Sequence, residues 1–123
     1  MNQKQLTKRV IIYHNPRCSK SRKALQLLQS KDIEITVIEY LKTPLNLEQL
    51  SQLCSCFSLS DLVRTSEPVF KELGLSLNNE RQVLEAMVKE PILMQRPIIV
   101  YNRTAIIARP PEKVLDFIDE LLQ

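Results

Sequence analysis

Apolar residues change their spacing twice between residues 10 and 40. The run Val10–Tyr13 is β-branched and aromatic and predicts a short strand. Beyond Cys18, apolar side chains recur at helical spacing and predict a helix; they are Ala24, Leu25, Leu27 and Leu28. Apolar and polar residues then alternate from Ile33, and this second strand continues to Tyr40 with a change of face. The N-terminal part therefore predicts strand, helix, strand.

The segment from about residue 44 to residue 91 has only short runs of helical spacing. Thr43-Pro44 breaks the strand pattern, and Asn46 to Gln49 has the form of a capping box ahead of a helix. Apolar residues continue that helix and the pieces after it: Leu47, Leu50, Leu53 and Phe57, then Leu62 and Val63, then Val69, Phe70 and Leu73, then Val83, Leu84, Met87 and Val88. Gly74 suits a helix C-cap, and Glu90-Pro91 closes the segment. We expect a helical lobe inserted into the sheet.

The C-terminal part predicts a hairpin followed by a helix. Ile98–Tyr101 and Thr104–Ile107 are β-rich runs separated by Asn102-Arg103, the length of a tight turn. Pro111 suits the first turn of a last helix with an apolar face, which is made of Val114, Leu115, Ile118, Leu121 and Leu122. The fold class expected is α/β, a mixed sheet with an inserted helical lobe.

Length and composition indicate one domain. The 123 residues, 44% of them hydrophobic, can bury one compact core, so a single domain over 1–123 is expected. No apolar run approaches the length of a membrane span, and Met1–Arg9 lacks the apolar core of a signal peptide. We expect a cytoplasmic protein that does not bind membranes.

Charge is distributed unevenly and surrounds one cysteine. Residues 1–31 carry eight Lys or Arg and no acid, although the net charge is only +3. Cys18 lies where the first strand should turn into the first helix, so the free helical amides and nearby cations can hold its thiol as a thiolate. The cations closest in sequence are Arg17, Lys20, Arg22 and Lys23. A packed cysteine is the ordinary alternative, but Pro16 and its polar neighbours indicate a loop.

The other two cysteines, Cys54 and Cys56, have no disulfide or zinc pattern. An odd cysteine count suits a reducing compartment, and one histidine, His14, cannot complete a usual zinc site, so no metal is expected. The simplest interpretation places both residues in a helix as packing side chains. A resolving role toward Cys18 remains an alternative.

Several function classes do not fit the sequence. One glycine in the chain excludes Gly-rich phosphate loops and dinucleotide fingerprints. A phosphatase loop would need an arginine where Ala24 stands. The modest net charge does not support nucleic-acid binding. If Cys18 acts on an oxyanion, arginines must come from elsewhere in the chain.

Three arginines are candidates for that role. Arg96 and Arg109 each precede a proline at the end of a predicted strand, and Arg64 lies in the helical lobe. Together with the segment His14-Asn15-Pro16-Arg17-Cys18-Ser19-Lys20-Ser21-Arg22, they resemble the glutaredoxin-coupled arsenate reductases, in order from about residue 10 to 119. The resemblance implies a thioredoxin-like fold with a helical insert.

The resemblance also implies roles in arsenic detoxification. Cys18 would attack arsenate. The oxyanion would be surrounded by Arg64, Arg96 and Arg109, and His14 would help to lower the thiol pKa. Glutathione would reduce the adduct as co-substrate, with no bound cofactor, and glutaredoxin would remove the mixed disulfide. Ser21 stands where dithiol relatives have a second cysteine, which fits a monothiol scheme, and Pro97 resembles the cis-proline of thioredoxin-like folds.

Two other functions are compatible with parts of the sequence. Ser19-Lys20 replaces a glycine-containing step of the arsenate reductases, which leaves the substrate open. A different glutathione-linked thiol oxidoreductase, such as one that removes glutathione from proteins, would keep Cys18 and Ser21. An Spx-type regulator that binds RNA polymerase would typically carry Cys-x-x-Cys and has no use for Arg109.

Overall fold

The computed structural model describes residues 8–122, and the chain divides into two compact units. The first contains the described residues up to Glu39 together with those from Arg96 onward, and the second is Tyr40–Gln95. The second unit encloses the helical insert expected over about 44–91. That the whole chain is one domain stays a prediction. The prediction that Met1–Arg9 lacks a signal-peptide core falls mostly on residues 1–7, which lie outside the described residues.

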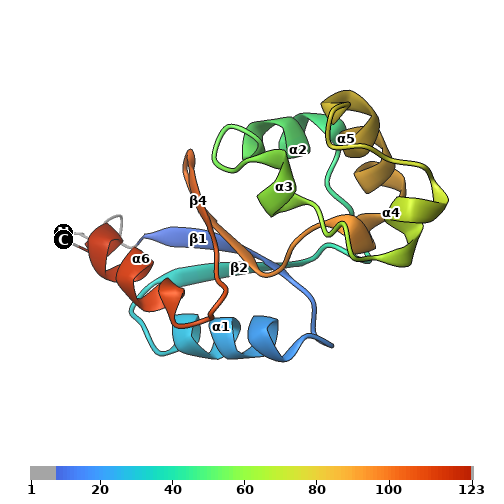
Figure 1. The fold of residues 1–123 in the computed structure, drawn as a ribbon. Helices are drawn as coiled ribbons and strands as arrows, with labels where there is room; N and C mark the ends of the chain where they lie inside the picture. The colour runs from blue at the N-terminus through green and yellow to red at the C-terminus, as the bar shows by residue number, and fades with distance from the viewer. Residues whose placement is uncertain (1–7, 123) are drawn as a thin grey trace. The chain divides into compact units, whose positions relative to one another are not determined.

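The first unit contains a mixed sheet of four strands in the order β2-β1-β3-β4 (Figure 1). Its elements are β1 (Arg9–His14), α1 (Ser19–Gln29), β2 (Glu34–Glu39), β3 (Ile98–Tyr101), β4 (Thr104–Ile107) and α6 (Lys113–Leu122). β1 pairs with β2 in parallel and with β3 antiparallel, and β3 pairs antiparallel with β4. All four predicted strands and both predicted helices of this unit are confirmed.

One face of the sheet carries the core of this unit. Successive side chains of a strand point to opposite faces, so Val10 and Ile12 of β1 and Ile99 of β3 share a face. α1 and α6 pack against it through Ala24, Leu28, Val114, Phe117 and Ile118. Of these, the sequence pattern missed only Phe117. Pro111 lies in the turn before α6, not inside the helix as predicted, because the N–H groups of Lys113 and Val114 bond to carbonyls three residues back.

The second unit is built from short helices. They are α2 (Leu47–Leu53), α3 (Leu59–Leu62), α4 (Pro68–Glu72), α5 (Glu80–Lys89) and the 3₁₀ turn η2 (Pro91–Leu93). The predicted capping box is present at α2: the Asn46 side chain accepts the Gln49 N–H at 2.8 Å, and the Gln49 side chain accepts the Asn46 N–H at 2.9 Å. No helix in the described range 8–122 is long and apolar enough to cross a membrane.

The predicted helix around Cys54 and Cys56 ends earlier than expected. α2 stops at Leu53, Cys54 is its C-cap, and Cys56 lies in the following turn, so the helical placement of both was wrong. The Ser55 hydroxyl donates to the Gln52 carbonyl at 2.6 Å, and the Ser55 N–H bonds the same carbonyl at 3.1 Å. These bonds occupy a carbonyl of the last turn and close the helix.

Gly74 ends α4 in the way the sequence predicted. Its φ of 64° is left-handed, and it stands one residue beyond the C-cap Leu73. The Gly74 N–H bonds the Lys71 carbonyl at 2.9 Å, and the Leu75 N–H bonds the Phe70 carbonyl at 3.2 Å. This pair of bonds is a Schellman motif, which requires the left-handed residue.

We predict that Gly74→Ala lowers the free energy of unfolding by about 1 kcal/mol, because a Cβ disfavours φ near 64° although nothing lies within 4 Å of it. Gly74→Asn should lose less, since asparagine tolerates this conformation. Urea unfolding of the two variants measures the difference. Equal losses would show that the conformation of this residue is not what matters.

Candidate functional site

Cys18 lies in the loop that joins the carboxyl end of β1 to the start of α1. It is the N-cap of α1, with extended backbone (φ −96°, ψ 122°), and its side chain is half-buried. The Cys18 N–H bonds the Asn15 carbonyl at 3.0 Å, and the Asn15 side chain accepts the Arg17 N–H at 2.9 Å. These bonds turn the chain sharply, so the thiol sits against the first free N–H groups of the helix.

The surroundings of Cys18 lower its pKa from the ordinary value of 9.0. Burial alone would raise the pKa of the thiol, but the stabilising groups outweigh it: the N–H of Ser21, the side chain of Arg96, the N–H of Lys20 and the charge on Arg96. Both N–H groups lie in the first turn of α1, and their partial positive charge favours the negatively charged form of the thiol. The predicted lowering of the thiol pKa agrees with this, but the cation that acts on the thiol is Arg96 and not one of Arg17, Lys20, Arg22 and Lys23.

A buried hydroxyl holds this junction together. Ser21 is fully buried in the first turns of α1, and its Oγ accepts the Asn15 N–H at 3.0 Å. The same Oγ lies 2.7 Å from Nδ1 of His14, the last residue of β1. Ser21 therefore links the strand end, the cysteine loop and the helix whose N–H groups face the sulfur.

His14 contacts Ser21 and is itself buried. Burial lowers the pKa of the imidazole; the charge on Glu39 raises it and the charge on Arg22 lowers it, and the net direction is down. The ring is therefore neutral at physiological pH. Its support of the Cys18 thiolate stays a prediction, and the contact in the structure is with the residue that positions the loop.

Arg96 and Arg109 are brought together by the register of the hairpin. The turn Asn102-Arg103 pairs Tyr101 with Thr104 and Ile98 with Ile107. The same register continued by two residues puts Arg96 opposite Arg109. Arg109 Nη1 donates to the Arg96 carbonyl at 3.0 Å.

The pairing of β3 with β1 explains why Arg96 reaches the thiol. Tyr13 pairs with Ile98, so the register continued past the strand ends places Arg96 opposite Asn15, at the start of the cysteine loop. The Arg96–Pro97 bond is cis, as the resemblance implied, and Arg109–Pro110 is also cis, which was not predicted.

Arg64 belongs to the second unit, where both its side chain and its backbone N–H make hydrogen bonds. Its Nε donates to Glu67 at 3.2 Å, and its Nη1 donates to Gln95 at 3.0 Å. The Arg64 N–H also bonds the Leu93 carbonyl at 2.7 Å. The guanidinium is thus held in one orientation, and its role at an oxyanion stays a prediction.

Two contributors to the site were missed by sequence reasoning. Asn15 and Ser21 are both buried, and their side chains make the bonds that shape the loop. The Asn-Pro step was a usable signal, because asparagine commonly accepts an N–H two residues on in such turns. The buried state of Ser21 had no sequence signal, since a serine near a helix start is usually an exposed cap.

Among the described residues, no group of three or more His, Cys, Asp or Glu is placed to hold a metal ion. Cys54 and Cys56 are both half-buried, and no disulfide joins them to each other or to Cys18. Burial and then the charge on Glu80 raise the pKa of the Cys54 thiol, the opposite of Cys18. A resolving role for either thiol stays a prediction.

The mixed sheet and the half-buried, thiolate-favouring cysteine at a strand-to-helix junction define a thioredoxin-like thiol protein. A family model described as the ArsC family matches residues 13–117. The chain belongs to the ArsC family.

Similar proteins cover nearly the whole chain. The uncharacterized protein YfgD of Escherichia coli K12 is 46% identical over 118 residues, covering 92% of this chain and 99% of YfgD. The arsenate reductase of Neisseria meningitidis serogroup B is 39% identical and covers 84% of this chain and 92% of its own. The structure of an arsenate reductase from Vibrio cholerae has a TM-score of 0.81 at 40% identity, covering 89% of this chain and 98% of that one.

We predict that Cys18 alkylates with a pH midpoint below 9 and that Arg96→Gln raises this midpoint. Removal of Arg96 takes away a hydrogen bond and a positive charge that favour the thiolate, so less thiolate is present at neutral pH. The rate of reaction with iodoacetamide is measured against pH in a Cys54→Ser/Cys56→Ser background. Arg81→Gln, at an exposed arginine of α5, is the control. A midpoint unaffected by Arg96→Gln would contradict the assignment.

We also predict that Ser21→Ala lowers the free energy of unfolding by about 1 to 3 kcal/mol, because the buried Asn15 N–H and the His14 ring lose their partner. Ser19→Ala changes an exposed serine in the same turn and should stay within about 0.5 kcal/mol of the parent. Guanidinium unfolding compares them. Similar losses in both variants would mean that the hydrogen bonds of the Ser21 hydroxyl do not contribute to stability.

Proposed function

We propose that this chain is an arsenate reductase in which Cys18 is the nucleophile. The proposal is carried by the Cys18 thiol at the N-terminus of α1, hydrogen-bonded by Arg96, in a member of the ArsC family. The arsenate reductases of Neisseria meningitidis, at 39% identity over 84% of this chain, support arsenate as the substrate.

The first step follows from the charges at the thiol. The Cys18 thiolate attacks arsenic(V) and displaces one oxygen, which leaves as water after protonation. Arg96 stabilises the negative charge of the incoming oxyanion, and Arg109, anchored to the Arg96 carbonyl, adds a second guanidinium. The family resemblance adds Arg64, of the second unit, as a third candidate cation for the oxyanion. Arginine suits this task because its planar fork matches the oxygens of a tetrahedral anion.

The second step uses an external thiol. The thiolate of glutathione bonds to the Cys18 sulfur, the electron pair of the sulfur–arsenic bond stays on arsenic, and arsenic(V) becomes arsenic(III). Arsenite leaves, and Cys18 remains as a mixed disulfide with glutathione. Glutaredoxin then takes up the glutathione and regenerates the Cys18 thiol. Each cycle converts two glutathione thiols to one disulfide, and no bound cofactor takes part.

The serine at position 21 supports this monothiol scheme. A dithiol enzyme of this class would resolve its own adduct with a cysteine there, whereas the Ser21 hydroxyl is buried and engaged with His14 and Asn15. The reductant is then a small thiol. We propose that the protein acts in the cytoplasm, where glutathione is abundant and cysteines are kept as thiols.

We predict that NADPH is consumed when the protein is supplied with arsenate, glutathione, glutaredoxin and glutathione reductase. Cys18→Ser should abolish the activity because the nucleophile is lost. Arg96→Ala and Arg109→Ala should each lower kcat/KM for arsenate by about 10- to 100-fold, because each removes a charged hydrogen bond to the oxyanion. Arg81→Ala, at an exposed arginine, is the control and should match the parent.

Absence of arsenate-dependent NADPH consumption, with a rapidly alkylating Cys18, would contradict the proposal. The same coupled system with a glutathionylated protein in place of arsenate then tests the other glutathione-linked activity that the sequence allowed. Activity on that substrate alone would assign the site to removal of glutathione from proteins.

A further inference from the structure

Four exposed cations lie around the cysteine loop. Arg17, Lys20, Arg22 and Lys23 are all exposed and lie in the loop before α1 or in its first turns. Within residues 8–122, none of the four forms an ion pair; Arg22 donates to the Pro16 carbonyl at 2.9 Å. We call these four residues the basic collar.

Local stability does not explain the basic collar. The N-terminal end of a helix carries a partial positive charge, so cations there are unfavourable. The first turn of α1 has no acidic residue to balance them. Residues placed against a local preference are expected at functional sites.

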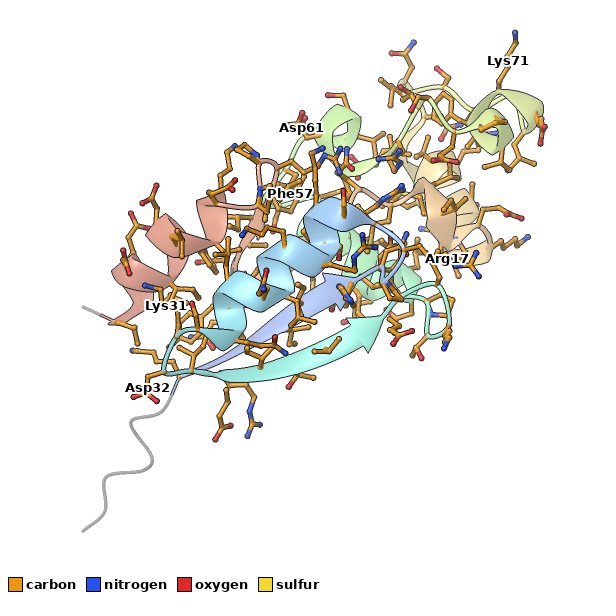
Figure 2. All side chains as sticks on the ribbon, turned by 90° about the horizontal axis from the view of Figure 1, so that it is seen from below. Arg17, Lys31, Asp32, Phe57, Asp61 and Lys71 are labelled. Atoms are coloured by element: carbon orange, nitrogen blue, oxygen red, sulfur yellow. The ribbon has the colours of Figure 1, made fainter. Side chains whose placement is uncertain are left out.

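Charge is separated along the first unit. α1 is 11 residues long, and the paired cations lie toward its other end: Lys31 with Asp119 at 3.4 Å, and Arg9 with Glu34. Figure 2 shows Arg17 beside the N-terminal end of α1 and Lys31 and Asp32 beyond its C-terminal end. The unbalanced positive charge is therefore concentrated around Cys18, where it attracts anions.

The basic collar differs from the arginines proposed to hold arsenate. Arg96 and Arg109 are both half-buried; Arg96 hydrogen-bonds the thiol, and Arg109 donates to the Arg96 carbonyl. Fixed, partly desolvated guanidinium groups of this kind suit a small oxyanion. The four collar cations are exposed to solvent, in the loop before α1 and in the first turns of that helix. Lys20 and Lys23, three residues apart, are neighbours on the helix surface. Such a surface suits a flexible ligand whose carboxylates are separated from its reacting atom.

We propose that the basic collar docks the carboxylates of glutathione, whose thiol must meet the sulfur of Cys18. The inference rests on the proposed function, because that function names glutathione as the reductant. Glutathione is a tripeptide thiol with two carboxylates and a net negative charge, so it complements a compact group of exposed cations. Attraction between exposed cations and the carboxylates of a ligand raises the rate at which ligand and protein meet, and salt screens this attraction.

Thiol–disulfide exchange tests the basic collar without arsenate. The Cys18 thiolate attacks one sulfur of oxidised glutathione, a Cys18–glutathione bond forms, and a glutathione thiolate leaves. The rate is compared with that for hydroxyethyl disulfide, which is uncharged. The ratio of the two rates cancels any change in the thiolate fraction of Cys18, because the same nucleophile attacks both reagents. Cys54→Ser/Cys56→Ser is the background, and intact mass gives the extent of reaction.

Lys20→Gln/Lys23→Gln should lower this ratio by about three- to tenfold at low ionic strength, and 0.5 M salt should remove the difference. Lys20→Arg/Lys23→Arg keeps the charge and should keep the ratio. Arg9→Gln/Lys31→Gln also removes two positive charges, but at the start of β1 and beyond the C-terminal end of α1, away from Cys18. This variant should leave the ratio within about twofold of the parent.

An unchanged ratio in Lys20→Gln/Lys23→Gln would overturn the proposal. If that variant instead slowed only the removal of glutathione by glutaredoxin, the surface would bind an acidic protein and not the tripeptide, which also overturns it. A lowered ratio in a protein without arsenate reductase activity would keep the basic collar and reject the proposed function. The two failures are therefore distinguishable.

Discussion

The buried hydroxyl of Ser21 is the contact on which the geometry at Cys18 depends. It accepts the Asn15 N–H at 3.0 Å and lies 2.7 Å from the His14 imidazole, so the strand end, the loop and the first turn of α1 are fastened at one atom. The same residue also lowers the pKa of the Cys18 thiol through its N–H. A serine can do both because its side chain faces the core while its amide is one of the free groups at the helix start.

Two kinds of positive charge surround this thiol, and burial separates their roles. Arg96, half-buried, acts directly on the sulfur and is positioned by pairing across three strands. The basic collar is exposed, so water and salt weaken each of its charges. A half-buried guanidinium suits a small oxyanion that must be held firmly, whereas solvated cations suit a larger ligand that must arrive and leave with each turnover.

Much of the fold of the first unit was predictable because its signals are local. The β-branched run of β1, the helical spacing of α1 and the two-residue turn between β3 and β4 each occur within a few neighbouring residues. The hairpin register even implies that Arg96 and Arg109 are opposite each other, since both follow from the position of Asn102-Arg103. The extent of α2 was mispredicted because Ser55 ends it with a side-chain bond that apolar spacing does not reveal.

From the sequence alone, the order of the elements, the capping box of α2, the left-handed Gly74 and the position of Cys18 at a helix start were determined. All of these depend on residues close together in the chain. The tertiary structure decided which cation stabilises the thiolate. The sequence favoured the cations near Cys18 in the chain, from Arg17 to Lys23, but Arg96 reaches the sulfur because β3 pairs antiparallel with β1. It also decided that Ser21 and His14 are buried together. Pairing between distant strands and burial within a core are set by the whole fold, so local sequence cannot specify them.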